Sequence, residues 1–244
     1  MIKNEVEIDV DDLFTKALDI KEIEVSPDYL CDEFHCSCYD KYLVPLYLEK
    51  NESSFVGNGV IVGSYLITAA HVAPSHNKKE RCPSLYYKYE NEFKKVKNDY
   101  VFYDGRNTEV EVGVSNDLII FNLDDIIGEF VCNDVPIKKG TRLYVSPYTY
   151  FEDENKTKSK QNICVVTSIG ALSFDKATIW KNCYRVYNSE GFRPGNSGCA
   201  LFRKNVLYGI LIVGGDIECD VRNYTILDAN YINQIITNER IVHY

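Results

Sequence analysis

Three short segments of the sequence carry side chains that could together perform nucleophilic catalysis. His71 lies in TAAHV, Asp117 in NDLIIFNL and Ser197 in GNSGCAL. Each lies where a predicted strand meets a turn, and a rigid scaffold presents reactive groups at such places. A serine hydroxyl is a weak nucleophile until an adjacent base takes its proton, and histidine is the commonest base of this kind. Each residue alone has an ordinary structural explanation, but their joint occurrence in this order indicates a catalytic set.

The elements that must position these residues read as strands. Short stretches rich in β-branched and aromatic residues, punctuated by Gly and Asn, run from 42 to 123, and a second set follows the turn at 137–140. Two sets of about six strands predict an all-β protein with two six-stranded antiparallel barrels. The first barrel, 41–128, would carry His71 and Asp117, and the second, 129–244, would carry Ser197.

The ends of the chain carry different patterns. Apolar residues at helical spacing predict short helices at 10–20 and 228–239, the second beginning after the N-cap candidate Asp228. Residues 1–40 form an acidic N-terminal extension. The mixed-charge run 151–161 has no apolar anchor beyond its first residue, which predicts a solvated hairpin loop.

The composition limits the classes of function. The 244 residues are 45% hydrophobic and 26% charged, as in ordinary globular proteins, and the net charge of −9 makes nucleic acid an unlikely principal partner. The sequence has neither the apolar core of a signal peptide nor a run of about 18 apolar residues that could cross a bilayer. Nine cysteines without a secretory signal predict free thiols in a reducing compartment, and therefore a cytoplasmic location without a membrane partner.

Five segments together resemble the trypsin/chymotrypsin-fold serine peptidases, over residues 40 to 240. TAAHV is similar to the histidine motif of that family, NDLIIFNL to its aspartate motif and GNSGCAL to its nucleophile motif. LYGILIVGG (207–215) resembles the strand that pairs with bound substrate, and NYTIL (223–227) resembles the last strand. The G-N-S-G form is closest in style to HtrA-type and viral chymotrypsin-like members, which do not need zymogen cleavage.

The resemblance implies a serine endopeptidase that forms an acyl-enzyme intermediate and needs no cofactor. His71 would be the general base, Asp117 would fix its tautomer, and Ser197 would be the nucleophile. The backbone N–H groups of Gly195 and Ser197 would form the oxyanion hole. Digestive trypsins have an aspartate where Asn196 stands here, and that aspartate pairs with a newly cleaved N-terminus, so activation by that route is not expected. The substrate would be a protein or peptide, and the oligomeric state stays open.

The specificity pocket is less typical of trypsins. Gly191 stands where trypsins keep an aspartate at the base of the pocket, so a preference for Lys or Arg has no support. Ile212 and Val213 fall on the strand that resembles the substrate-pairing strand, and Gly214 matches the glycine at the pocket neck. Arg222 falls at the back of the pocket, where a guanidinium would bind an Asp or Glu side chain of the substrate. The alternative is that Arg222 points to solvent and the pocket accepts apolar or aromatic residues.

Three other functions stay in view. The fold could bind peptides without cutting them, as a pseudo-peptidase, although the intact triad argues against this. It could bind RNA in an accessory role, although no basic stripe interleaved with aromatic residues is present. Cys31, His35, Cys36 and Cys38 could hold zinc, but four ligands within eight residues fit a tetrahedral site poorly, so no metal is expected.

Overall fold

The computed structural model describes most of the chain beyond the acidic extension. All described residues belong to one compact unit, Cys31–Tyr244. The predicted helix at 10–20 lies outside the described residues. The described residues are 37–73, 84–97, 100–105, 113–151, 156–159, 162–170, 172–175, 178–213 and 223–242.

The first set of strands forms one antiparallel sheet. Its members are β1 (Leu43–Tyr47), β2 (Phe55–Gly63), β3 (Tyr65–Ala69), β4 (Tyr86–Tyr89), β5 (Glu92–Lys95), β6 (Tyr100–Asp104), β8 (Leu118–Asn122) and β9 (Gly128–Glu129). Neighbouring strands follow the order β5-β4-β1-β2-β3-β8-β6, with β9 beside β2. Every residue of β1 and β3 is buried, so both faces of these central strands are covered. Short 3-10 helices lie beside this sheet: η1 (Ser37–Tyr42), η2 (Glu52–Ser54) and η3 (Ala70–Val72).

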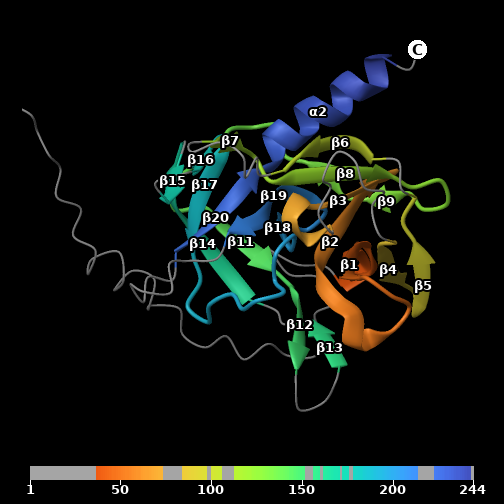
Figure 1. Ribbon diagram of the computed structural model, residues 1–244. Helices are drawn as coiled ribbons and strands as arrows, with labels where there is room; N and C mark the ends of the chain where they lie inside the picture. The colour runs from red at the N-terminus through yellow and green to blue at the C-terminus, as the bar shows by residue number, and fades with distance from the viewer. Residues whose placement is uncertain are drawn as a thin grey trace, which may run out of the picture. The chain divides into compact units, whose positions relative to one another are not determined.

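The second set closes into a six-stranded barrel. Its members, with β10 added at one side, are β10 (Val131–Cys132), β11 (Arg142–Val145), β14 (Asn162–Ile169), β17 (Cys183–Tyr187), β18 (Ala200–Arg203), β19 (Val206–Val213) and β20 (Asn223–Asp228). The order is β10-β19-β18-β11-β14-β17-β20, and pairing of β19 with β20 closes the ring. Figure 1 draws these strands in green to blue. The predicted all-β fold of the double-barrel class is confirmed, whereas the boundary between 128 and 129 stays a prediction.

Two smaller sheets accompany the main ones. In the first, β12 (Tyr148–Phe151) pairs with β13 (Lys156–Ser159), so part of the predicted hairpin loop is a strand. In the second, β16 (Thr178–Trp180) pairs with β15 (Leu172–Asp175) and, in parallel, with β7 (Gly113–Ser115). The β12–β13 hairpin matters most for the site, because it starts directly beside β2.

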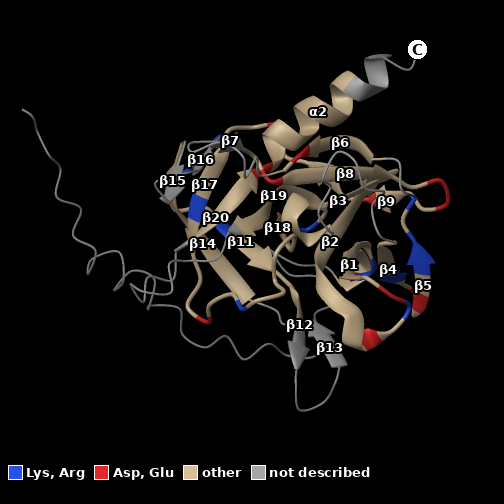
Figure 2. Cartoon of the chain, in the orientation of Figure 1, with Lys and Arg blue, Asp and Glu red and all other residues tan. Residues whose placement is uncertain are grey.

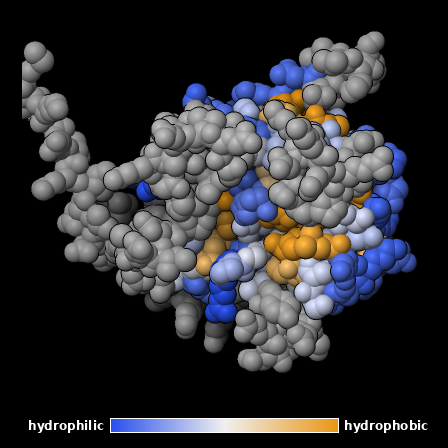
Figure 3. Space-filling view, viewed as in Figure 1, coloured by the Kyte–Doolittle hydropathy of each residue, from blue (hydrophilic) through white to orange (hydrophobic). Residues whose placement is uncertain are grey.

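The hydrophobic core runs through both main sheets. One cluster joins buried residues of the first sheet to buried residues of the second, for example through Phe130 and Phe202, whose ring centroids are 5.4 Å apart. A separate cluster fills the closed barrel, where Cys164 and Val166 of β14 point inward at alternate positions. On the face seen in Figure 3, hydrophobic side chains gather beside α2 and over β1 and β2, with hydrophilic surface around them.

The predicted C-terminal helix is confirmed as α2 (Ala229–Val242). The backbone N–H of Asn230 donates to Asp228 Oδ1 at 2.9 Å, which caps the first turn. Ile232 and Ile236 are buried one turn apart, and they fix the helix against the core. Within the described part of the chain, no helix has the length and apolar character needed to span a membrane.

Candidate active site

His71 lies in η3, directly after the buried strand β3. Ala69 and Ala70 before it are 0% and 4% exposed, and Val72 after it is 5% exposed. The small alanines and the valine pack into the core of the first sheet. The imidazole between them is 46% exposed, so the fold anchors the backbone and presents the ring.

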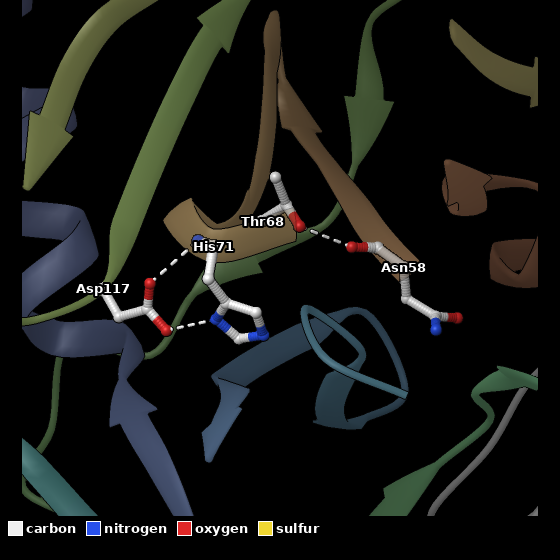
Figure 4. Close-up of polar contacts among 4 residues, drawn as sticks. All are labelled: Asn58, Thr68, His71 and Asp117. Atoms are coloured by element: carbon white, nitrogen blue, oxygen red, sulfur yellow. Dashed lines mark hydrogen bonds and ion pairs between the residues drawn. The ribbon is translucent and has the colours of Figure 1, made fainter. Parts of the chain in front are cut away.

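Asp117 holds this ring at two points (Figure 4). Its Oδ1 accepts the backbone N–H of His71 at 2.9 Å, and its Oδ2 lies 2.5 Å from Nδ1 of the ring. A carboxylate can only accept hydrogen bonds, so this contact favours the tautomer that carries the proton on Nδ1 and the lone pair on Nε2. Nε2 points away from the carboxylate, where it can serve as a base.

The backbone around Asp117 is shaped for this contact. Asp117 is 1% exposed and has φ +50°, a left-handed conformation that Asp adopts more readily than most residues. Its carbonyl accepts the N–H of Ala70 at 2.8 Å. The preceding Asn116 donates through Nδ2 to Asp104 at 2.7 Å and to the hydroxyl of Tyr231 in α2 at 3.2 Å. The carboxylate is therefore positioned by β6, by η3 and by the C-terminal helix.

The segment before Ser197 forms a tight turn over Arg193, Pro194, Gly195 and Asn196. The N–H of Asn196 donates to the carbonyl of Arg193 at 3.0 Å, and Gly195 has φ +88°. An i to i+3 hydrogen bond with Pro at the second position and a left-handed Gly at the third characterises a type II turn. In this turn the peptide between Pro194 and Gly195 has one fixed orientation, so the direction of the Gly195 N–H is fixed as well.

The segment after Ser197 lies between the two main sheets. The carbonyl of Ser197 accepts the N–H of Asn58 in β2 at 2.8 Å, and Gly198 donates to Leu211 in β19 at 2.8 Å. Gly198 has φ +79°, and a Cβ there would lie 2.1 Å from the carbonyl oxygen of Asn58 and 2.3 Å from Oγ1 of Thr68. Only glycine fits this contact, which explains the residue after the serine in GNSGCAL.

The two halves of the candidate site thus meet through the backbone. Thr68, three residues before His71, donates its hydroxyl to the carbonyl of Asn58 at 2.6 Å (Figure 4). The backbone N–H of Asn58 in turn donates to the carbonyl of Ser197 at 2.8 Å. Among the described residues, His71 and Ser197 share no hydrogen bond. Neither the Gly195 amide nor the Ser197 amide has an acceptor among them, so both N–H groups are available to a ligand.

The predicted specificity residues are only partly described. Gly191 has φ +72°, and a Cβ there would lie 3.0 Å from the hydroxyl of Tyr224, so the position suits glycine. The ring of Phe192 packs edge-on against the ring of Tyr224, and the two ring centroids are 4.7 Å apart. Ile212 is 1% exposed within β19. Val213 ends β19, whereas Gly214 and Arg222 lie outside the described residues.

The cysteine chemistry is described in part. Cys199, two residues after Ser197, is 2% exposed, and burial raises the pKa of its thiol well above the usual value. Of the zinc candidates, Cys31, His35 and Cys36 lie outside the described residues, and Cys38 is exposed. Within the described ranges, no three His, Cys, Asp or Glu side chains are grouped as a metal site would require.

The hydrogen-bonding roles of two polar residues of the site were not predicted from the sequence. Asn58 and Asn196 are each 2% exposed, and each makes three side-chain hydrogen bonds around the Arg193–Asn196 turn. The available signal for Asn58 was a lone amide in the apolar strand FVGNGVIV, because a buried amide must find partners. Its partners are distant in the chain and could not be named.

The comparisons with known proteins agree with this architecture. A search of curated protein sequences finds no significant match. Among solved structures, the HtrA-type protease AlgW with decapeptide is 16% identical, with a TM-score of 0.56 over 76% of this chain and 53% of AlgW. The chain therefore spans about half the length of AlgW.

For two further solved structures, the match covers nearly the whole length of the other chain. Neuropsin, a serine protease expressed in the limbic system of mouse brain, is 15% identical with a TM-score of 0.56, over 81% of this chain and 93% of that one. A scabies mite inactivated protease paralogue is also 15% identical, with a TM-score of 0.57 over 82% and 96%. At such identities the likeness concerns the fold alone. The model of the family described as Trypsin matches residues 37–236, which include every described part of both main sheets, and the chain belongs to that family.

Proposed function

We propose that the protein is a serine endopeptidase that hydrolyses peptide bonds with His71, Asp117 and Ser197 as its catalytic triad. The observation that carries this proposal is the 2.5 Å contact between Nδ1 of His71 and Oδ2 of Asp117. It leaves Nε2 as the basic atom of an exposed ring. The trypsin-family fold supports the same activity.

The reaction would proceed in two halves. In the first, Nε2 of His71 takes the proton of Ser197 Oγ while the oxygen attacks the substrate carbonyl carbon. The N–H groups of Gly195 and Ser197 stabilise the oxyanion, and Nε2 then gives its proton to the leaving amine. In the second half, Nε2 takes a proton from water while the water oxygen attacks the acyl carbon. The bond between that carbon and Oγ breaks, and Nε2 returns the proton to Oγ. Asp117 stays ionised and stabilises the imidazolium in both halves.

A preference for Asp or Glu at the cleaved position is the finer part of the proposal. It rests on the alignment of Arg222 with the back of the pocket. The surroundings of Gly191 support an uncharged pocket base, because φ +72° favours glycine there and an added Cβ would lie 3.0 Å from the Tyr224 hydroxyl. A cleavage profile against a diverse peptide pool tests it, and preference for Leu, Phe or Lys over the acidic residues would refute it.

A second candidate is a fold that binds peptides without cleaving them. It is favoured by one observation, the lack of a hydrogen bond between His71 and Ser197 among the described residues. In free enzymes this contact is often long and shortens only when substrate binds, so reactivity of the serine decides between the two functions.

Labelling by a fluorophosphonate probe separates the two candidates. The probe phosphonylates only an activated serine, so we expect stoichiometric labelling of the wild type and none of Ser197→Ala. Ser189→Ala, a change at an exposed residue of the segment before Ser197, is the matched control and should label fully. A folded wild type that does not label, or a Ser197→Ala variant that labels equally, would refute the peptidase.

A further inference from the structure

Asn58 is a fully buried amide in the middle of a strand, and every group of its side chain is satisfied. Its Nδ2 donates to the carbonyl of Gly195 at 2.8 Å and to the carbonyl of Tyr148 at 3.1 Å. Its Oδ1 accepts the N–H of Tyr148 at 2.6 Å. Exchanging the oxygen and nitrogen would set like groups against each other at all three contacts, so the partners dictate the orientation of the amide.

Asn196 provides a second buried amide, which also donates to the carbonyl of Tyr148. Its Nδ2 donates to the carbonyl of Tyr148 at 3.0 Å and to Oγ1 of Thr149 at 3.0 Å. Its Oδ1 accepts the N–H of Arg193 at 2.7 Å. The Tyr148 carbonyl therefore accepts from both amides, that of Asn58 in β2 and that of Asn196 in the turn before β18. This fills both lone pairs of the Tyr148 oxygen.

The two amides hold the Arg193–Asn196 turn at two places. Asn58 fixes the carbonyl of Gly195, and Asn196 fixes the N–H of Arg193. Between these atoms lies the Pro194–Gly195 peptide, which carries the Gly195 N–H. Type I and type II turns differ chiefly by a rotation of this central peptide, which exchanges the positions of its N–H and its carbonyl. A turn that lost its anchors could therefore replace the oxyanion donor by an acceptor.

We propose that Asn58 is a positioning residue of the oxyanion hole. It would hold the turn in its type II form from the first sheet, so that the Gly195 N–H is in place before substrate binds. The inference rests on the proposed function for its catalytic consequence, but the conformation of the turn can be observed without any activity. Because an oxyanion donor acts mainly in the transition state, losing it should lower kcat and change KM little.

The test compares crystal structures and kinetics of the wild type, Asn58→Ala and Asn58→Val. Valine suits a strand and has no polar group, so it can neither donate to Gly195 nor accept from Tyr148, and it serves if the cavity left by alanine prevents folding. We expect the Pro194–Gly195 peptide to rotate or become mixed in the variants, and kcat for peptide cleavage to fall about 100-fold with KM changed less than about threefold.

Asn133→Ala is the matched control. Asn133 is another buried amide, 7% exposed, whose Nδ2 donates to the Val135 carbonyl far from the turn in sequence. This variant should lose stability but keep its kcat. A turn that keeps its conformation in both Asn58 variants, or a kcat equal to that of Asn133→Ala, would overturn the inference. A wild type without Ser197-dependent cleavage would instead refute the proposed function and leave the structural comparison to decide this inference.

Discussion

Gly198→Ala tests how closely the two sheets meet behind Ser197. The new methyl group would lie 2.1 Å from the carbonyl oxygen of Asn58 and 2.3 Å from Oγ1 of Thr68, which are hydrogen-bonded to each other. The first atom is backbone and the second belongs to a short, β-branched side chain that is fully buried, so the backbone must move. We expect a cost of about 1–3 kcal/mol for overpacking, added to about 1–2 kcal/mol for alanine in the left-handed conformation at φ +79°.

The expected loss in Tm follows from the size of the protein. In proteins of 150–250 residues, each 1 kcal/mol changes Tm by about 2–4 °C. The summed cost of about 2–5 kcal/mol therefore predicts a Tm lower by about 4–20 °C. Differential scanning calorimetry at one scan rate would measure it, with reversibility checked by a second scan.

Gly140→Ala is the matched control for this variant. Gly140 has nearly the same backbone angle, φ +83°, but no atom within 4 Å of the added Cβ. It should lose only the backbone part, about 1–2 kcal/mol. The difference between the two variants measures the steric contact alone, and equal losses of Tm would refute the close approach of Gly198 to β2.

Three other changes have defined outcomes. Asp117→Asn should lower kcat about 10⁴-fold, because an amide cannot hold the imidazole in the tautomer protonated at Nδ1; steady-state peptide cleavage measures this, and a loss below tenfold would contradict it. Burial raises the pKa of the Asp228 carboxyl, because the folded protein favours its protonated form. The folded state is therefore more stable at low pH, and this stability is lost as the pH rises through the raised pKa. Asp228→Asn keeps the helix cap, so urea unfolding should find it more stable than wild type near pH 7 but not near pH 3; an equal difference at both would contradict the burial effect. Burial raises the pKa of the Cys164, Cys183 and Cys199 thiols, so iodoacetamide near pH 7.5 should modify them only after unfolding, as peptide mapping would show.

The sequence supports the fold class because its signals are local. Strand periodicity and turn residues predict both sets of strands, and apolar spacing predicts α2 to within a few residues. The contact between His71 and Asp117 spans 46 residues, but each lies in a short recognisable segment, so the pair could be proposed. Among the described residues, the order of the first sheet ends at β5 and β6, and this could not be predicted because strand patterns do not say which edges meet.

The support of the Arg193–Asn196 turn could not be predicted either. Asn58 bonds to atoms 90 and 137 residues away, and all of those acceptors are backbone carbonyls. Backbone groups are present at every position, so they leave no signal in the residue types. A buried asparagine indicates that partners exist, but only the fold identifies them.

The first sheet, whose strand order ends at β5 and β6 among the described residues, has a consequence for behaviour at high concentration. An end strand exposes backbone groups that a strand from another molecule could pair with, which is a common start of aggregation. Along β5, Glu92, Lys94 and Lys95 place charge on this edge, which Figure 2 shows in red and blue. Nζ of Lys94 donates to Oδ2 of Asp125 at 2.8 Å. Any incoming strand would have to strip water from these charges. The lysines of β5 therefore oppose self-association through this edge. In the second barrel, the closed ring already pairs its six strands with one another.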